Sequence, residues 1–189
     1  MIVTLAVLAV LASSPSNLSQ VIRESDIWTE ATKKIRRLQP DTFPNLPPEI
    51  VNELKRRRCT IPQAEGYPDP HNVVNGSFER RGQTDWAVVC SNGDVSRILV
   101  FWGASAARVA ELESSQDRDW LQSGADGRIE YSRKIEPVGQ QYIIQHYEAY
   151  GGEKPPPIDH EGINNIFEGK ASVVLYFYQG KWLKLTGAD

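Results

Sequence analysis

The segment "TDWAVVCSNGDVSRILVFWG", Thr84 to Gly103, decides the fold class. It contains two runs rich in Val, Ile, Phe and Trp on either side of Ser91–Asp94, and an Asn-Gly pair between such runs is a strong hairpin signal. Because successive side chains of a strand point to opposite faces, we expect a central strand that is covered on both sides. The first run is apolar on both faces, with Trp86, Val88 and Cys90 on one and Ala87 and Val89 on the other.

Two helices are predicted before this hairpin. "SDIWTEATKKIRRLQP", residues 25–40, has apolar residues at helical spacing and Ser25 as a candidate N-cap. "LPPEIVNELKRRRCTIPQ" begins a second helix at Pro47 and Pro48, which suit a first turn, and Pro62 ends it. The Lys and Arg residues in their last turns complement the helix dipole, so we interpret them as a solvated face. We expect the two helices to cover one face of the sheet.

The rest of the chain favours strands and one more helix. Residues 107–116 suit a strand or a short helix, and two short strands are predicted around a turn at 124–127. Tyr142, Ile143, His146, Tyr147 and Tyr150 follow a helical stripe that Gly151 ends, although a strand remains an alternative. In residues 171–178, Ala171, Val173, Leu175 and Phe177 alternate with Ser172, Val174, Tyr176 and Tyr178, which predicts a strand, and Gln179-Gly180 turns the chain into a final strand.

These elements together predict an α+β fold, in which N-terminal helices pack on a mainly antiparallel β-sheet built from hairpins. The 189 residues, 40% of them hydrophobic, are enough for one globular domain with a sizeable core. We place that domain at 21–189. Its helical segment is 21–62, and 63–189 is β-rich with one further helix near 140–150.

The N-terminus predicts export. Residues 1–12, "MIVTLAVLAVLA", form an apolar run too short to cross a bilayer, which is typical of a signal peptide ending at residue 12 or as late as residue 20. No Lys or Arg precedes the run, so an uncleaved anchor is an alternative. No second apolar run has spanning length, and we expect a secreted or periplasmic protein without a membrane span in its mature chain.

The cysteine content fits an exported chain. Cys59 and Cys90 are the only two cysteines. An even number in an oxidising compartment predicts a disulfide between them, and two separate buried thiols are the alternative.

A short resemblance surrounds the first strand of the hairpin. In "NGSFERRGQTDWAVV", residues 75–89, the residues Gly76, Phe78, Gly82, Asp85 and Ala87 resemble one FG-GAP or VCBS-type repeat. In that family the loop commonly holds Ca²⁺, which prefers six to eight oxygen ligands. The corresponding positions here are Ser77, Glu79, Arg81 and Asp85, and Arg81 would place a positive charge among the ligands. We therefore predict no metal, with Asp85 accepting backbone N–H bonds across a turn that depends on Gly82.

The whole chain also resembles small uncharacterised exported bacterial proteins. The resemblance rests on "CTIPQ", Cys59 to Gln63, before such a strand and on the ending "GKWLKLTGAD". It implies a location and a domain type, and no activity.

Several enzyme classes are disfavoured by the sequence. The zinc, P-loop and nucleophile-elbow motifs are all missing, and Cys90 lies in an apolar strand unsuited to a thiolate nucleophile. One cluster suggests chemistry: Asp159 and Glu161 would share a face of an extended segment, with His160 opposite and His146 or His71 completing the site. A polar surface loop is the alternative interpretation of this cluster.

Two function classes therefore remain. The favoured one is a non-catalytic exported domain that binds a protein, a glycan or another envelope component, with Tyr176, Tyr178 and Trp182 as candidate stacking residues. The alternative is a small hydrolase that uses Asp159, His160 and Glu161. No cofactor is predicted, and a net charge of −3 disfavours a nucleic-acid partner.

Overall fold

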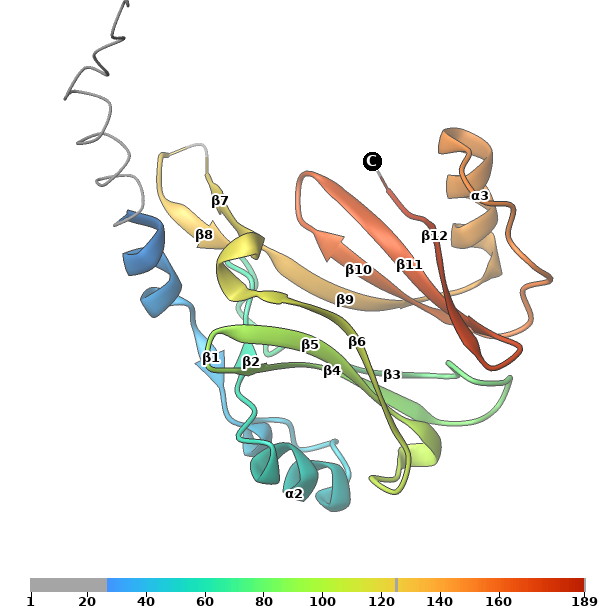
Figure 1. Ribbon diagram of the computed structural model, residues 1–189, viewed down its shortest axis with the longest axis horizontal. Helices are drawn as coiled ribbons and strands as arrows, with labels where there is room; N and C mark the ends of the chain where they lie inside the picture. The colour runs from blue at the N-terminus through green and yellow to red at the C-terminus, as the bar shows by residue number, and fades with distance from the viewer. Residues whose placement is uncertain (1–26, 125, 189) are drawn as a thin grey trace, which may run out of the picture.

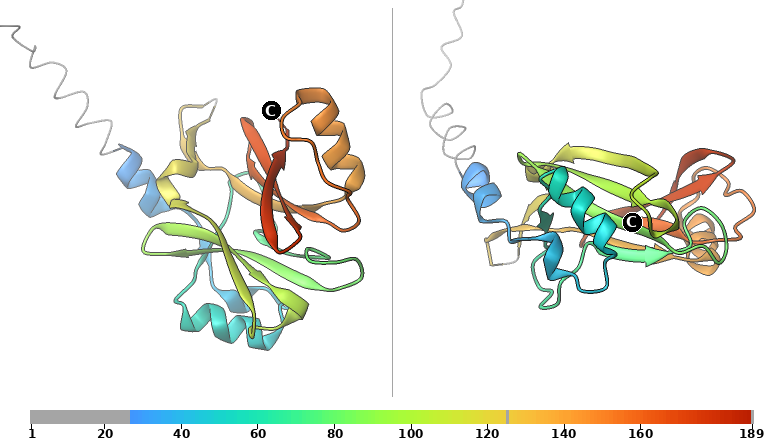
Figure 2. Two further views of the ribbon diagram at one scale, coloured as in Figure 1. Left: turned by 45° about the vertical axis from the view of Figure 1, so that its right-hand side comes forward. Right: turned by 90° about the horizontal axis from the view of Figure 1, so that it is seen from below.

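The protein folds into four layers, helix on sheet on sheet on helix, as the computed structural model shows in Figures 1 and 2. The structure describes residues 27–124 and 126–188. The first sheet has the strand order β3 (Val73–Gly76), β4 (Asp85–Asn92), β5 (Val95–Phe101) and β6 (Val109–Gln116), and the second has the order β12 (Lys181–Thr186), β11 (Ala171–Tyr178), β10 (Gly162–Phe167) and β9 (Arg133–Val138). All of their pairings are antiparallel, so the predicted α+β class with hairpin-built sheets is confirmed.

The β4–β5 hairpin is the centre of the first sheet. Asn92 pairs with Val95, and the two residues between them, Gly93 and Asp94, both have positive φ, which suits a two-residue hairpin turn. Val88 and Cys90 contribute to the core beneath the sheet, whereas Ala87 and Val89 contribute to the core between the two sheets. The central strands are thus covered on both sides, as predicted.

Helix α2 (Pro48–Arg56) covers the outer face of the first sheet. Its fully buried Ile50 and Leu54 pack against Val88 and Leu99 of the sheet. The predicted disulfide is present: Cys59, just after the helix, is bonded to Cys90 of β4. The link therefore ties the helical segment to the central strand.

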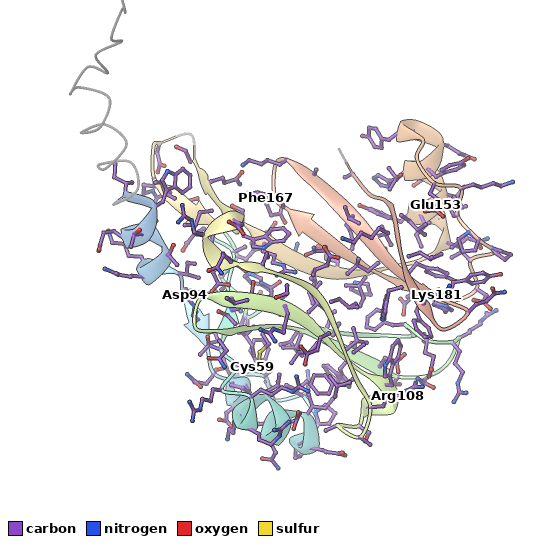
Figure 3. All side chains as sticks on the ribbon, viewed as in Figure 1. Cys59, Asp94, Arg108, Glu153, Phe167 and Lys181 are labelled. Carbon is purple, nitrogen blue, oxygen red and sulfur yellow. A yellow bond between two sulfur atoms is a disulfide. The ribbon has the colours of Figure 1, made fainter. Side chains whose placement is uncertain are left out.

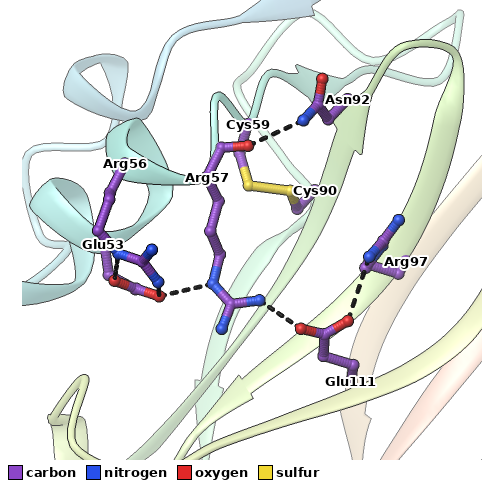
Figure 4. Close-up of polar contacts among 8 residues, drawn as sticks. All are labelled: Glu53, Arg56, Arg57, Cys59, Cys90, Asn92, Arg97 and Glu111. Atoms are coloured by element: carbon purple, nitrogen blue, oxygen red, sulfur yellow. Dashed lines mark hydrogen bonds and ion pairs between the residues drawn. A yellow bond between two sulfur atoms is a disulfide. The ribbon is translucent and has the colours of Figure 1, made fainter.

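Charged side chains connect the end of α2 to the edge of the first sheet (Figure 4). Glu53 accepts hydrogen bonds from Arg56 and Arg57, and these bonds lower the pKa of Glu53 to about 2. Arg57 also forms an ion pair with Glu111 of β6. The basic run at the end of α2 is thus engaged with carboxylates of its own fold, in agreement with the predicted solvated face.

The first predicted helix ends earlier than expected and packs elsewhere. Residues 27–34 are helical, but residues 37–38 form strand β1 (Arg37–Leu38), which pairs with β2 (Ile61–Pro62). Pro40 disfavours a helical Gln39, which is extended here, and the 3-10 turn η1 (Pro40–Thr42) follows. Ser25 and the predicted signal segment, 1–12 or to 20, lie outside the described residues.

The helix at 27–34 packs against a small hairpin. This hairpin consists of β7 (Leu121–Ser123) and β8 (Ile129–Tyr131), the two short strands predicted around the turn at 124–127. The hairpin comes directly after the 3-10 turn η3 (Asp117–Trp120). A separate 3-10 turn, η2 (Trp102–Ala104), comes directly after β5. Figure 2 shows the helix beside the hairpin, and Ile35, Leu121 and Tyr131 form the buried core between them. Only α2, of the two predicted helices, therefore covers the sheet.

Helix α3 (Gln140–Tyr150) covers the outer face of the second sheet. It matches the helix predicted near 140–150 and ends at Gly151, whose φ is 75°. Ile143 is fully buried against Val174 and Tyr176 of β11. The side chains of all layers are drawn in Figure 3, which labels Cys59 near α2 and Asp94 at the β4–β5 turn.

A buried arginine joins the two sheets at one end of the interior. Arg133, on β9, has no exposed surface. Its guanidinium donates to Asn165 Oδ1 at 3.1 Å, to Ser96 Oγ at 2.9 Å and to the carbonyl oxygen of Glu113 at 3.1 Å. The group also lies 4.3 Å from the centre of the Trp120 ring. Since Ser96 and Glu113 belong to the first sheet and Asn165 to the second, Arg133 fixes how the sheets meet.

His71 gives the stability of the fold a pH dependence. Its Nε2 accepts the N–H of Ala64 at 2.7 Å, which requires a neutral ring, and burial lowers the pKa of His71 below its ordinary value of 6.5. Protonation then favours the unfolded chain, so stability is complete above about pH 6.5 and falls as the pH decreases from there. Urea unfolding at pH 7.5 and 5.5 should show this loss, and His71→Gln should reduce it. An unchanged loss in His71→Gln, or an equal reduction in His146→Gln, would contradict the assignment.

Candidate functional site

The loop between β3 and β4 is organised by one buried carboxylate. Asp85 Oδ2 accepts the N–H groups of Phe78 at 2.9 Å and Glu79 at 3.0 Å, and Oδ1 accepts the N–H of Gly103 at 2.7 Å. Gly82 has a φ of 81°, which a residue with a side chain rarely adopts. The structural role predicted for Asp85 and Gly82 is confirmed.

The loop is bonded to the segment that precedes β10. Glu161 Oε2 accepts the N–H of Ser77 at 2.8 Å, and the N–H of Glu161 donates to the carbonyl oxygen of Ser77 at 2.9 Å. A Cβ at position 76 would lie 2.9 Å from Glu161 Oε2 and 2.7 Å from the Phe78 ring, so this contact requires Gly76. The most patterned loop of the sequence and the predicted acidic cluster are therefore neighbours in space.

A hollow of about 370 Å³ opens where these two segments meet the start of α3. Ser77 and Arg81 line it from the loop, Gly139 and Gln140 from the helix, and residues 158–161 from the remaining side. The volume lies at the lower end of the range of about 300–1,000 Å³ for small-molecule sites. All three predicted residues of the acidic cluster, Asp159, His160 and Glu161, line this one hollow.

Two other hollows are of similar size, with volumes of about 470 and 440 Å³. Glu30 and Arg128, in the first, are each held in an ion pair with a residue of their own element or turn. Glu168, in the second, accepts a hydrogen bond from Tyr67. The hollow at Asp159–Glu161 is the better candidate site, because it contains all three residues of the predicted acidic cluster.

His160 has one occupied and one open ring nitrogen. The side chain is only 5% exposed, and its ring stacks on that of Tyr176 with centroids 4.3 Å apart. Nδ1 lies 3.0 Å from the carbonyl oxygen of Glu161, which can only accept, so Nδ1 carries the proton in the neutral ring. Nε2 lies 3.8 Å from Asp159 Oδ1, which is too far for a hydrogen bond. Among the described residues, Nε2 therefore has no hydrogen-bond partner.

The two carboxylates of the cluster differ in their surroundings. The Asp159 side chain is 79% exposed and accepts a hydrogen bond from the Tyr176 hydroxyl at 3.3 Å. Glu161 is partly buried and holds the Ser77 amide. Asp159 is thus free to meet a ligand, whereas one oxygen of Glu161 serves the fold.

The other two histidines lie away from the hollow. His146 is on α3, where its ring stacks between those of Tyr142 and Tyr150 and Nδ1 lies 2.9 Å from the carbonyl oxygen of Tyr142. His71 binds the Ala64 amide. Neither residue lines the hollow that contains His160.

The three candidate stacking aromatics do not share one surface. Tyr176 is fully buried and, with Tyr178, packs toward α3. Trp182 faces the opposite way, into the core between the sheets, where it stacks on Trp102 with ring centroids 5.5 Å apart. Tyr176 stacks on the ring of His160, and the three candidate residues lie on two different faces of the sheet.

The first turn of α3 contributes unused hydrogen-bond donors. No side chain among the described residues caps the helix, whose N-cap is Gly139, and no acidic residue occupies its first turn. The free N–H groups and the dipole make such an end favourable for negative charge. Sequence reasoning missed Gly139 and Gln140 because only the tertiary fold brings them beside 158–161.

Three further results concern metal ligands, membrane-spanning helices and relatives. Across residues 27–124 and 126–188, no group of three or more His, Cys, Asp and Glu side chains is placed to hold a metal ion. No helix in the described part of the chain is long and apolar enough to span a membrane. Comparison with protein-family models, curated proteins and solved structures finds no match.

Proposed function

We propose that the protein is a non-catalytic exported domain that binds a small envelope component in the hollow at Asp159–Glu161. The observation that carries the proposal is the open Nε2 of His160, on a side chain that is only 5% exposed. Nε2 has no hydrogen-bond partner among the described residues and belongs to a residue that lines the hollow, so it is available to a ligand. The uncapped start of α3 adds unused donors to the same hollow.

The proposed location outside the cytoplasm is supported by the disulfide. Bonds such as Cys59–Cys90 persist in oxidising compartments and are rare in the cytosol. A periplasmic or secreted domain encounters sugars, amino acids and fragments of the cell wall, which are polar and small enough for a hollow of about 370 Å³.

A pair of helix variants tests the proposal. Gln140→Trp fills the mouth of the hollow, whereas Gln145→Trp adds the same side chain to an exposed position of α3 outside it. Amino acids, monosaccharides and short carboxylic acids are each screened by thermal denaturation. At a concentration of 100 times Kd, a bound compound stabilises the folded state by about 2.7 kcal/mol, which raises Tm by several degrees.

We expect one class of compound to raise the Tm of the wild type and of Gln145→Trp, and to leave that of Gln140→Trp unchanged. Equal Tm values of the two variants without ligand serve as the folding control. Stabilisation of Gln140→Trp equal to that of the wild type would locate binding outside the hollow and reject the proposal.

A small hydrolase that uses Asp159, His160 and Glu161 is a second candidate. It is favoured by the same ring geometry, because the Glu161 carbonyl orients Nδ1–H and leaves Nε2 free to accept a proton from a water molecule. Hydrolysis of a bound ester, amide or glycoside should then be lost in His160→Gln. A rate that His160→Gln leaves unchanged would remove this candidate.

A further inference from the structure

We infer that the ligand of the hollow is a small zwitterion, a free α-amino acid, whose ammonium group meets Asp159 and His160 and whose carboxylate meets Arg81 and the start of α3. The inference rests on the proposed function and specifies its ligand. The four groups come from three separate segments and all line the one hollow.

The ammonium position follows from the distance between two acceptor atoms, Asp159 Oδ1 and His160 Nε2. Asp159 Oδ1 and His160 Nε2 are 3.8 Å apart, and in the neutral ring both atoms are acceptors. A nitrogen between them can lie about 2.9 Å from each, which is the usual length of an N–H hydrogen bond. An ammonium group has three N–H bonds and can donate to both atoms at once. The pair is thus suited to one cationic nitrogen.

The carboxylate position follows from the positive groups of the hollow. Arg81 is exposed, and no ion pair involving it is found in the described part of the chain. The first turn of α3 offers backbone N–H groups and the positive end of its dipole. A guanidinium group and a helix N-terminus are both typical partners of a carboxylate.

The mixture of positive and negative groups in the hollow disfavours ligands that carry only positive or only negative charge. A simple anion would meet Asp159 and Glu161, and a simple cation would meet Arg81 and the helix dipole. Like charges at close range raise the energy of binding. A ligand that carries both charges satisfies both sides of the hollow, and its size matches the modest volume of about 370 Å³.

Truncated ligands test the inference. Each of the twenty amino acids is titrated calorimetrically, and any that binds is compared with its analogues that lack the amino or the carboxyl group. The simplest set is L-alanine, propionate and ethylamine, with D-glucose as a neutral polar probe. We expect at least one amino acid to bind, and each of its two truncated analogues to bind at least tenfold more weakly.

Two variant pairs separate the ends of the ligand. Arg81→Gln and Asp159→Asn should each weaken amino-acid binding about tenfold. Arg80→Gln and Asp69→Asn are the controls, because they remove the same charges at residues that do not line the hollow, and they should leave binding unchanged.

The outcomes distinguish the inference from the proposed function. Tight binding of propionate or ethylamine alone, or of D-glucose with no amino acid, would overturn the zwitterion and leave a binding domain. Amino-acid binding that Arg81→Gln and Arg80→Gln weaken equally would also overturn it. If no amino acid, acid, amine or sugar binds, both the inference and the proposed function fail.

Discussion

Loss of the disulfide should lower the free energy of unfolding by about 3–4 kcal/mol, since Cys59 and Cys90 are separated by 31 residues and their bond restricts the unfolded chain. Both cysteines are buried in the core between α2 and the first sheet, so the segment from α2 to β4 is the part most affected. We expect Cys59→Ser/Cys90→Ser to fold with a lower urea midpoint than the oxidised wild type.

The control for this prediction is the wild type unfolded in the presence of a reductant. Its midpoint should match that of the double variant, because both lack the same covalent constraint. A double variant as stable as the oxidised protein would show that the bond adds nothing to the fold.

Truncation of Arg133 should destabilise the protein by about 3 kcal/mol or more. Arg133→Ala leaves a cavity and deprives Asn165, Ser96 and the Glu113 carbonyl of their donor, and an unsatisfied buried acceptor costs about 1–3 kcal/mol. Urea unfolding measures the loss. Since Arg133 donates hydrogen bonds to both sheets, we expect one cooperative unfolding transition whose midpoint lies at a lower urea concentration.

Arg128→Ala is the matched control for Arg133→Ala. The Arg128 side chain is 75% exposed and forms an ion pair with Asp126 on the surface. Such pairs contribute about 0–1 kcal/mol, so this variant should be nearly as stable as the wild type. Equal losses in the two arginine variants would contradict the role assigned to Arg133.

The strands were the most predictable part of the fold. In β4 and β5, two runs that are apolar on both faces and a short turn between them predict both the hairpin and its cover on two sides. The predicted helix at 25–40 does not extend beyond residue 34, because residues 37–38 pair with β2, a contact distant in sequence that helical periodicity does not reveal. The helix was predicted to pack on the main sheet, and this prediction was also wrong. It packs on the β7–β8 hairpin, which is distant in sequence.

The candidate site was predictable only in part. Asp159, His160 and Glu161 are adjacent in sequence, but their position beside the start of α3 depends on the pairing of β9 with β10. Their contact with Ser77 depends on how the two sheets pack together. The buried position of Arg133 had no signal, because arginine is usually exposed.

The aromatic candidates show how register decides a surface. Tyr178 pairs with Lys181 across the two-residue turn, which aligns Trp182 with Phe177 and not with Tyr176. Paired residues share a face of the sheet, so Trp182 points away from the two tyrosines. The turn length alone would have predicted this separation.

The central claim is that the hollow at Asp159–Glu161 is a ligand site, and amide NMR tests it most directly. Labelled wild-type protein is titrated with a mixture of amino acids, monosaccharides and short carboxylic acids. We predict saturable shifts of the backbone amide signals of Ser77, Gln140 and His160, which surround the hollow. Shifts confined to Tyr178 and Trp182, or to the helix at 27–34, with unchanged signals at the hollow, would contradict the claim.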